Sequence, residues 1–287
     1  MFKKITKKCK NLLILGRYNN PVGAFLLMWP CYWGALSNSN LNAILLESLI
    51  LFTLGSFVMR GAGCCINDIF DKDFDIKIKR TKKRPLASGT LNILESIIFT
   101  LFQLFLGLII LLQFETNVII LSLMIIPLVL TYPLFKRFTY FPQIILGLAF
   151  NWGVLVGYLS QTENFNFSIL YLYFAGVFLT TAYDTVYGFQ DIQGDKKIGL
   201  KSLAILFEKK RKSLCLVYVL SSIFFSIFFF ETYANTFLSV LSSLIVFSML
   251  IKQYLNFENG MKINKIFKSN VIIGGIIAFL IILQNYL

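Results

Sequence analysis

The chain has 287 residues, of which 57% are hydrophobic and 14% charged, and its 27 basic against 14 acidic residues give a net charge of +13. The low charged fraction excludes an ordinary soluble enzyme, in which about 25% of residues are charged, and the hydrophobicity excludes a disordered chain. The absence of histidine excludes Ser-His-Asp triads and HExxH zinc sites.

Long uncharged runs recur along the chain, and a run of about 20 apolar residues is enough to cross a bilayer as a helix. The first run, residues 18–46, is interrupted by the polar residues 37–40, which predict a turn. Eight more follow, at 48–67, 96–114, 116–135, 138–162, 164–183, 213–230, 232–251 and 269–287, of which the first is interrupted only by Arg60. We therefore expect an all-α, polytopic membrane protein with nine transmembrane helices, in which residues 1–287 form a single domain.

The basic residues indicate the orientation of these helices. Of the 27 lysines and arginines, 26 lie in the N-terminal segment or in every second loop, and the four opposite loops contain none. The positive-inside rule places the N-terminus in the cytoplasm. The charge excess therefore reports topology in a lipid bilayer, and we expect no nucleic acid partner. Lysines outnumber arginines 21 to 6, which suggests an AT-rich bacterial genome and hence the inner (cytoplasmic) membrane.

All seven aspartates lie at the cytoplasmic ends of the second and sixth predicted helices. They are Asp68, Asp71, Asp73, Asp75, Asp184, Asp191 and Asp195. Asn67, Asp71 and Asp75 recur every four residues, and Asp191 and Asp195 do the same, so on a helix each set shares one face. Carboxylates crowded in this way repel one another unless a cation lies among them, and hard oxygen ligands suit Mg²⁺ that bridges to substrate phosphates.

Basic residues follow each aspartate cluster. Lys77 and Arg80 come after the first cluster, and Lys201 comes after the second. Metal-binding carboxylates beside lysine and arginine can hold a diphosphate and neutralise it as it leaves. Arg60 lies inside the second predicted helix, where a cation usually faces a cavity; the alternative is that its side chain reaches the membrane interface.

Both aspartate segments resemble motifs of the UbiA superfamily of intramembrane prenyltransferases. Residues 67–75 are similar to the NDxxDxxxD motif, and residues 184–195 are similar to DxxYxxxDxxxD. The resemblance continues through residues 80–89, 132–137 and 198–207, and extends over essentially the whole chain. The last two segments are most similar to the members that act on 4-hydroxybenzoate.

The resemblance implies nine helices around a central cavity, capped on the cytoplasmic side by loops at about 67–90 and 184–212. It implies transfer of a polyprenyl group from polyprenyl diphosphate to the carbon ortho to the hydroxyl of 4-hydroxybenzoate, in ubiquinone biosynthesis. The implied ligands of Mg²⁺ are Asn67, Asp71, Asp75, Asp191 and Asp195. One departure from the family pattern is Asn20, where a basic residue is frequent, and Arg17 is the candidate to replace it.

We assign further roles to individual residues as expectations. The four aspartates of the metal site and Tyr187 are the expected catalytic residues. Arg60, Lys77, Arg80 and Lys201 are expected to hold the diphosphate. Arg137 and Tyr132 are expected to bind the acceptor.

Two alternatives remain open from the sequence. One is another transferase of the same family, of the menaquinone, haem O or phytyl type. The other is a cation transporter, which would instead place carboxylates near the middle of the bilayer.

Overall fold

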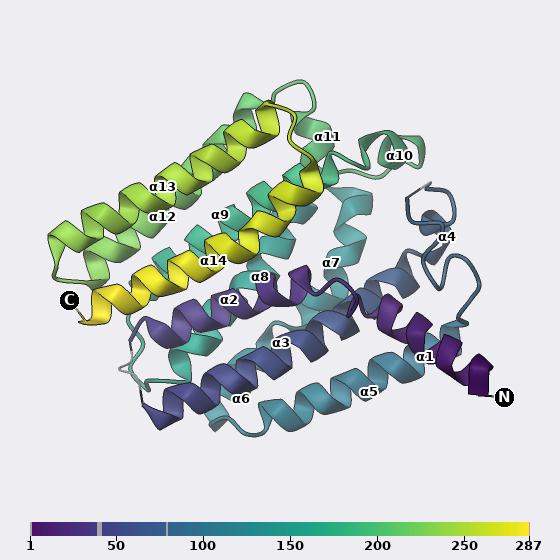
Figure 1. Cartoon of the computed structure of the whole chain (residues 1–287), viewed down its shortest axis with the longest axis horizontal. Helices are drawn as coiled ribbons and strands as arrows, with labels where there is room; N and C mark the ends of the chain where they lie inside the picture. The colour runs from purple at the N-terminus through teal and green to yellow at the C-terminus, as the bar shows by residue number, and fades with distance from the viewer. Residues whose placement is uncertain (1, 39–41, 79, 287) are drawn as a thin grey trace.

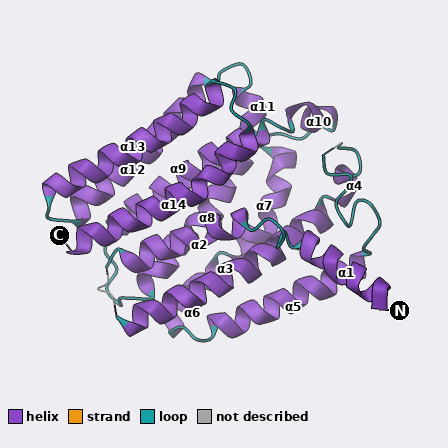
Figure 2. Ribbon diagram, in the orientation of Figure 1, coloured by secondary structure: helices purple, strands orange, loops and turns teal. Residues whose placement is uncertain are grey.

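The computed structural model describes residues 2–38, 42–78 and 80–286. This part of the chain is built from helices and connecting loops, without strands (Figure 2). The helices are α1 (Phe2–Leu15), α2 (Val22–Leu36), α3 (Ala43–Phe70), α4 (Lys72–Asp75), α5 (Ile93–Leu111), α6 (Thr116–Met124), α7 (Ile126–Phe138), α8 (Pro142–Leu159), α9 (Ile169–Gly188), α10 (Ile192–Lys197), α11 (Leu203–Phe207), α12 (Lys212–Thr232), α13 (Thr236–Glu258) and α14 (Ile263–Tyr286).

Eight apolar helical segments of the described chain are long enough to span a membrane: α3, α5, α6 together with α7, α8, α9, α12, α13 and α14. The first predicted span corresponds to α2, which is apolar but has only 15 residues, or about 22 Å at 1.5 Å per residue. The predicted turn at 37–40 lies partly outside the described residues. Counting α2, the described residues agree with the predicted nine spans.

The predicted span at 116–135 forms two helices rather than one. α6 ends at Met124 and α7 begins at Ile126, with Pro127 in its first turn. Proline has no amide hydrogen to donate and its ring collides with the preceding turn, so the helix ends and starts again.

The spans pack closely around α2 and α9. α2 contacts α8, α3 and α14, and α9 lies between α8 and α12. Two glycines bring α2 and α8 together: a Cβ at Gly34 would lie 2.0 Å from the Val154 carbonyl oxygen, and one at Gly157 would lie 2.1 Å from that of Cys31. Large side chains on the outer faces, such as Leu101 and Phe105 of α5, stay exposed, as expected for helices that face lipid.

The short helices gather at one end of the bundle. In Figure 1, α1, α4 and α10 lie at the right, beyond the ends of the spans, and the C-terminus lies at the opposite end. Termini at opposite ends fit an odd number of spans. Helix α1 was not predicted; Leu12 and Leu15 attach it to a small apolar cluster with Cys65, Leu86 and Leu91.

Candidate functional site

Two neighbouring cavities lie at the end of the bundle that carries the aspartates. The first, of about 250 Å³, is lined by both aspartate segments, and we call it the aspartate cavity. The second, of about 320 Å³, is walled by residues between 16 and 24, and we call it the N-terminal cavity. Residues common to both linings are Gly23, Arg60, Arg80, Arg84, Asp184, Tyr187 and Phe267. The two cavities are therefore adjacent.

The aspartate segments cross helix boundaries instead of continuing one helix. α3 ends at Phe70 and α9 ends at Gly188, and a short helix follows each. Hydrogen bonds from the amide of Asp71 to the carbonyl of Asn67 (2.9 Å) and from that of Asp75 to Asp71 (2.8 Å) preserve the one-turn repeat across the first boundary. A 2.8 Å bond from the Asp195 amide to the Asp191 carbonyl does the same in the second. Each set therefore still faces one cavity.

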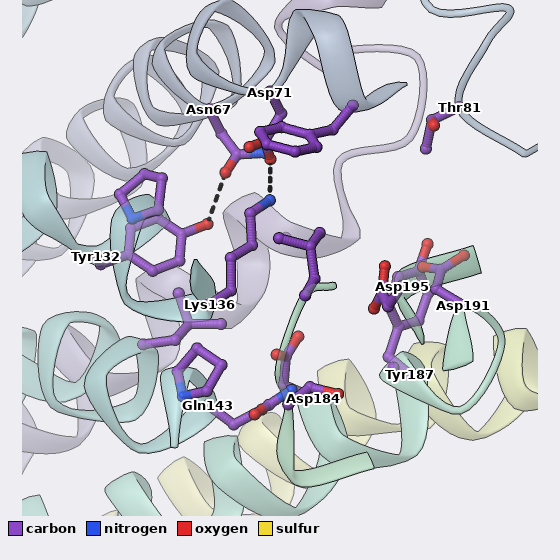
Figure 3. A pocket seen from close by; sticks show the side chains of 18 of the residues that line it. Asn67, Asp71, Thr81, Tyr132, Lys136, Gln143, Asp184, Tyr187, Asp191 and Asp195 are labelled. Atoms are coloured by element: carbon purple, nitrogen blue, oxygen red, sulfur yellow. Dashed lines mark hydrogen bonds and ion pairs between the residues drawn. The ribbon is translucent and has the colours of Figure 1, made fainter. Parts of the chain in front are cut away.

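Ion pairs hold three of these carboxylates. Arg80 donates from Nε and Nη2 to the two oxygens of Asp191, at 2.7 and 2.5 Å, and so joins the first loop to the second. Arg84 donates to Asp75 at 2.7 Å, and Lys136 of α7 pairs with Asp71. Figure 3 shows Lys136 and Tyr132 pointing toward Asp71 and Asn67. These pairs bring cations from separate elements to the carboxylates.

Burial and the charge of Asp191 shift the pKa of two loop residues that face the cavity, Asp195 and Arg80. Burial and the charge of Asp191 raise the pKa of Asp195 to about 6. Burial alone would lower the pKa of Arg80, but the hydrogen bonds and charge of Asp191 raise it above its ordinary value. Near neutral pH, Asp195 is thus largely ionised beside a second carboxylate, which favours a cation in this part of the cavity.

The residues expected to bind Mg²⁺ supply suitable donors. Asn67, Asp71, Asp75, Asp191 and Asp195 all line the aspartate cavity and offer only oxygen ligands, the chemistry that Mg²⁺ prefers. Within the described residues no three acidic side chains are gathered closely enough to form a ready metal cluster. However, Oδ1 of Asp71 is buried without a hydrogen-bond partner. Leaving a buried carboxylate oxygen unpaired costs free energy unless a ligand binds to it. The five oxygen-bearing side chains therefore fit Mg²⁺.

The cavity brings together most of the predicted residues but not all of them. Those that line it are Arg60, Asn67, Asp71, Asp75, Arg80, Tyr132, Tyr187, Asp191, Asp195 and Lys201. Lys77 is exposed and lines neither cavity. Arg137 also lies outside both: it donates to the Phe70 carbonyl at 3.3 Å and stacks over the Phe74 ring at 5.0 Å.

Sequence reasoning missed Lys136 and Gln143 as lining residues. Lys136 follows Tyr132 by four residues, so the two share a helix face, and this spacing could have favoured it over Arg137. Gln143 accepts a 3.0 Å hydrogen bond from the Leu203 amide and so ties α8 to α11. No sequence pattern indicates that contact.

Arg60 faces both cavities from within the membrane-spanning part of α3. Its guanidinium lies 5.4 Å from the ring centroid of Phe150, and its Nε is buried without a hydrogen-bond partner. Gly23 makes room for it, because a Cβ there would lie 2.4 Å from that nitrogen. Arg60 is therefore a half-buried cation whose buried Nε is left for a ligand.

The fold and these cavities define a multi-pass membrane protein with a site of aspartates and basic residues at one end of its bundle. The sequence model of the UbiA prenyltransferase family matches residues 27–271, and the chain belongs to this family. Family membership replaces the cation transporter as an explanation of the carboxylates.

Individual relatives agree with this assignment. The chain is 43% identical over 212 residues to 4-hydroxybenzoate polyprenyltransferase, mitochondrial, of Drosophila melanogaster, a match that covers 73% of this chain and 54% of that protein. The chain spans about half the length of such curated relatives.

Solved structures show the same fold. A UbiA homolog from Aeropyrum pernix K1 superimposes with a TM-score of 0.77 at 22% identity, covering 92% of this chain and 98% of that one. A UbiA homolog from Archaeoglobus fulgidus, solved bound to GPP and Mg²⁺, gives 0.72 at 18% identity and covers 95% and 99%.

Proposed function

We propose that the protein is an Mg²⁺-dependent 4-hydroxybenzoate polyprenyltransferase, which forms the carbon–carbon bond ortho to the acceptor hydroxyl during ubiquinone biosynthesis. The observation that carries the proposal is the convergence of both aspartate segments and their cations on one cavity at the end of a membrane bundle. The name of the Drosophila relative supports the acceptor, and the GPP- and Mg²⁺-bound homolog supports the donor and metal. We propose that residues 1–287 act as one domain in this reaction.

The diphosphate of the donor belongs in the aspartate cavity. Mg²⁺ held by Asn67, Asp71, Asp75, Asp191 and Asp195 would neutralise part of its charge. Three basic residues line the same cavity and neutralise the remaining negative charge of the diphosphate: Arg80, Lys136 and Lys201. As the allylic C–O bond breaks, the electron pair leaves with the diphosphate, and these cations stabilise the growing negative charge.

The allylic cation that forms needs a dry, electron-rich surrounding. Tyr187 lines both cavities and packs against Phe267, with ring centroids 4.6 Å apart. An aromatic face attracts a desolvated cation by about 2 kcal/mol. Tyr187 therefore occupies the boundary where donor and acceptor meet, and it stabilises the cation while the walls exclude water.

The acceptor belongs in the N-terminal cavity, because that cavity adjoins the donor site through Arg60 and Tyr187. Among the described residues that line this cavity, Arg60 is the cation whose buried Nε has no hydrogen-bond partner, and its guanidinium pairs with the carboxylate of 4-hydroxybenzoate. This role replaces the diphosphate-binding role that the sequence predicted for Arg60. It also replaces Arg137 by Arg60 as the residue that binds the acceptor carboxylate. The electron-rich ring carbon then attacks the allylic carbon, and the proton on that carbon passes to the released diphosphate, so that the ring regains its aromaticity.

A direct assay tests the function. Purified protein in lipid nanodiscs, given labelled 4-hydroxybenzoate, a polyprenyl diphosphate and Mg²⁺, is expected to form a prenylated product, and EDTA is expected to abolish it. Parallel reactions with acceptors of the menaquinone, haem O and phytyl pathways serve as the comparison. Product from one of these acceptors and none from 4-hydroxybenzoate would reassign the chain within its family.

The charge pattern supports a cytoplasmic N-terminus in a bacterial inner membrane. The Drosophila relative is named as mitochondrial, so the compartment rests on the basic loops and the lysine-rich composition of this chain. Among the described residues Cys9 of α1 is the exposed cysteine.

Cys9 allows the orientation to be measured in intact bacteria. A membrane-impermeant maleimide is expected to label Cys9 only after the inner membrane is permeabilised. Cys9→Ser provides the background signal. Equal labelling of Cys9 in intact spheroplasts would reverse the proposed orientation.

A further inference from the structure

Asp68 belongs to the first aspartate segment but lines neither cavity. Its side chain is 1% exposed and faces the opposite way, toward two arginines. Arg17 donates from Nη2 to both carboxylate oxygens at 2.9 Å, and Arg84 donates from Nη1 to Oδ1 at 3.0 Å. Both of its oxygens are thus used within the protein, which distinguishes Asp68 from its neighbour Asp71.

Arg17 connects Asp68 to the N-terminal cavity. Within the described chain it is the one residue other than glycine with positive φ, at 61°, a conformation that an L-residue keeps only when its surroundings enforce it. Its Nη1 donates to the carbonyls of Ile14 (3.0 Å) and Leu15 (3.2 Å) at the end of α1, and its side chain lines the cavity wall. Arg17 therefore fixes the turn between α1 and α2 onto α3.

Arg84 connects Asp68 to the aspartate cavity. The same Nη1 that donates to Asp68 also donates to Asp75 at 2.7 Å, and Arg84 lines both cavities. The loop around it is fastened by Thr81, whose hydroxyl donates to the Asp75 carbonyl at 3.0 Å. The result is a continuous chain of charges from the α1 turn through Arg17, Asp68 and Arg84 to Asp75.

We propose that Asp68 is a positioning residue that couples the two cavities: through Arg17 it holds the wall of the N-terminal cavity, and through Arg84 it holds Asp75 and the first cap loop. The catalytic part of this inference rests on the proposed function. Two arginines and two aspartates balance in charge, and a buried pair that loses one member leaves the other uncompensated. Removing the charge of Asp68 therefore disturbs both cavities at once.

Asp68→Asn keeps the size of the side chain and removes its charge, and Asp73→Asn is the matched control. Asp73 is an exposed residue of the same segment that lines neither cavity. Hydrogen–deuterium exchange in nanodiscs, without substrates, is expected to become faster in Asp68→Asn at residues 16–20 and 81–88 together, and to stay unchanged in Asp73→Asn. Faster exchange at only one of the two segments would overturn the coupling. Because this readout needs no substrate, it stands even if the chain does not prenylate 4-hydroxybenzoate.

Kinetics provide the second readout. Asp68→Asn is expected to lower kcat/KM for donor and acceptor by roughly 10- to 100-fold, as small misplacements of reacting groups do. Arg17→Met, which leaves the Asp68–Arg84 pair intact, is expected to raise the acceptor KM at least about fivefold with kcat changed by less than about twofold, as loss of uniform binding does. If Asp68→Asn does not fold, the kinetics of Arg17→Met test the proposal instead. A loss in kcat without a change in acceptor KM would contradict the proposal.

The double variant tests whether the residues act as one unit. Arg17→Met combined with Asp68→Asn is expected to be no slower than Asp68→Asn alone, because residues of one network are not additive. Independent, multiplying losses would show that Asp68 does not act through Arg17. Asp68→Glu, which restores the charge, is expected to recover part of the rate; no recovery relative to Asp68→Asn would contradict a role for the charge.

Discussion

Asp71→Asn and Asp191→Asn are each expected to lower the rate of prenyl transfer by about 10²- to 10³-fold, the usual loss when one preorganised stabilising group is removed. Asp71 is 3% exposed, with one oxygen paired to Lys136 and the other buried without a partner. An amide at this position offers one neutral oxygen in place of two charged ones. The measurement is kcat in nanodiscs at saturating donor, acceptor and Mg²⁺.

Two further observations separate a lost metal site from a misfolded protein. Mg²⁺ with inorganic diphosphate is expected to raise the melting temperature of the wild-type protein, because a ligand stabilises the state it binds, and to raise it much less in both variants. Asp73→Asn, whose side chain lies outside the cavities, is expected to behave as wild type in both assays. Wild-type rates in Asp71→Asn and Asp191→Asn would remove these residues from the metal site.

The spans were predictable because a bilayer imposes a length and a composition on every helix that crosses it. The sequence did not reveal α1 as a helix, because its lysines hid the apolar side that carries Leu12 and Leu15. It also did not reveal the break between α6 and α7, which depends on a single proline. Hydropathy thus predicts which segments cross the membrane better than it predicts their internal geometry.

The aspartates of the site were predictable for a different reason. Both segments leave the membrane on the same side, so the topology alone brings them near each other, and the four-residue repeat survives the helix ends. Asp68 shows the limit of this argument. Its motif groups it with Asp71, but its partner Arg17 lies 51 residues earlier, and only the folded chain shows that the two meet.

The basic residues were the least predictable part of the site, and they provide matched pairs for a final test. Arg80 and Lys136 line the aspartate cavity and pair with its carboxylates, whereas Lys77 and Arg137 lie outside both cavities. Arg80→Met and Lys136→Met are expected to lower kcat/KM for the prenyl diphosphate by about 10²-fold each, because each removes a cation from a charge-stabilising site. Lys77→Met and Arg137→Met are expected to stay within about twofold of wild type, because solvated charges contribute little.

This comparison keeps hydrophobicity and net charge matched, since every variant replaces one cation by methionine. It therefore separates cations that contact the diphosphate from cations that are present only because cytoplasmic loops are enriched in lysine and arginine. A larger loss in Arg137→Met than in Lys136→Met would contradict the assignment of Lys136, and not Arg137, to the diphosphate site. Added guanidinium is expected to restore part of the rate of Arg80→Met but not of Asp191→Asn, because the guanidinium partner of Asp191 is missing only in the first variant. Rescue of both variants would place the effect of guanidinium outside the Arg80–Asp191 pair.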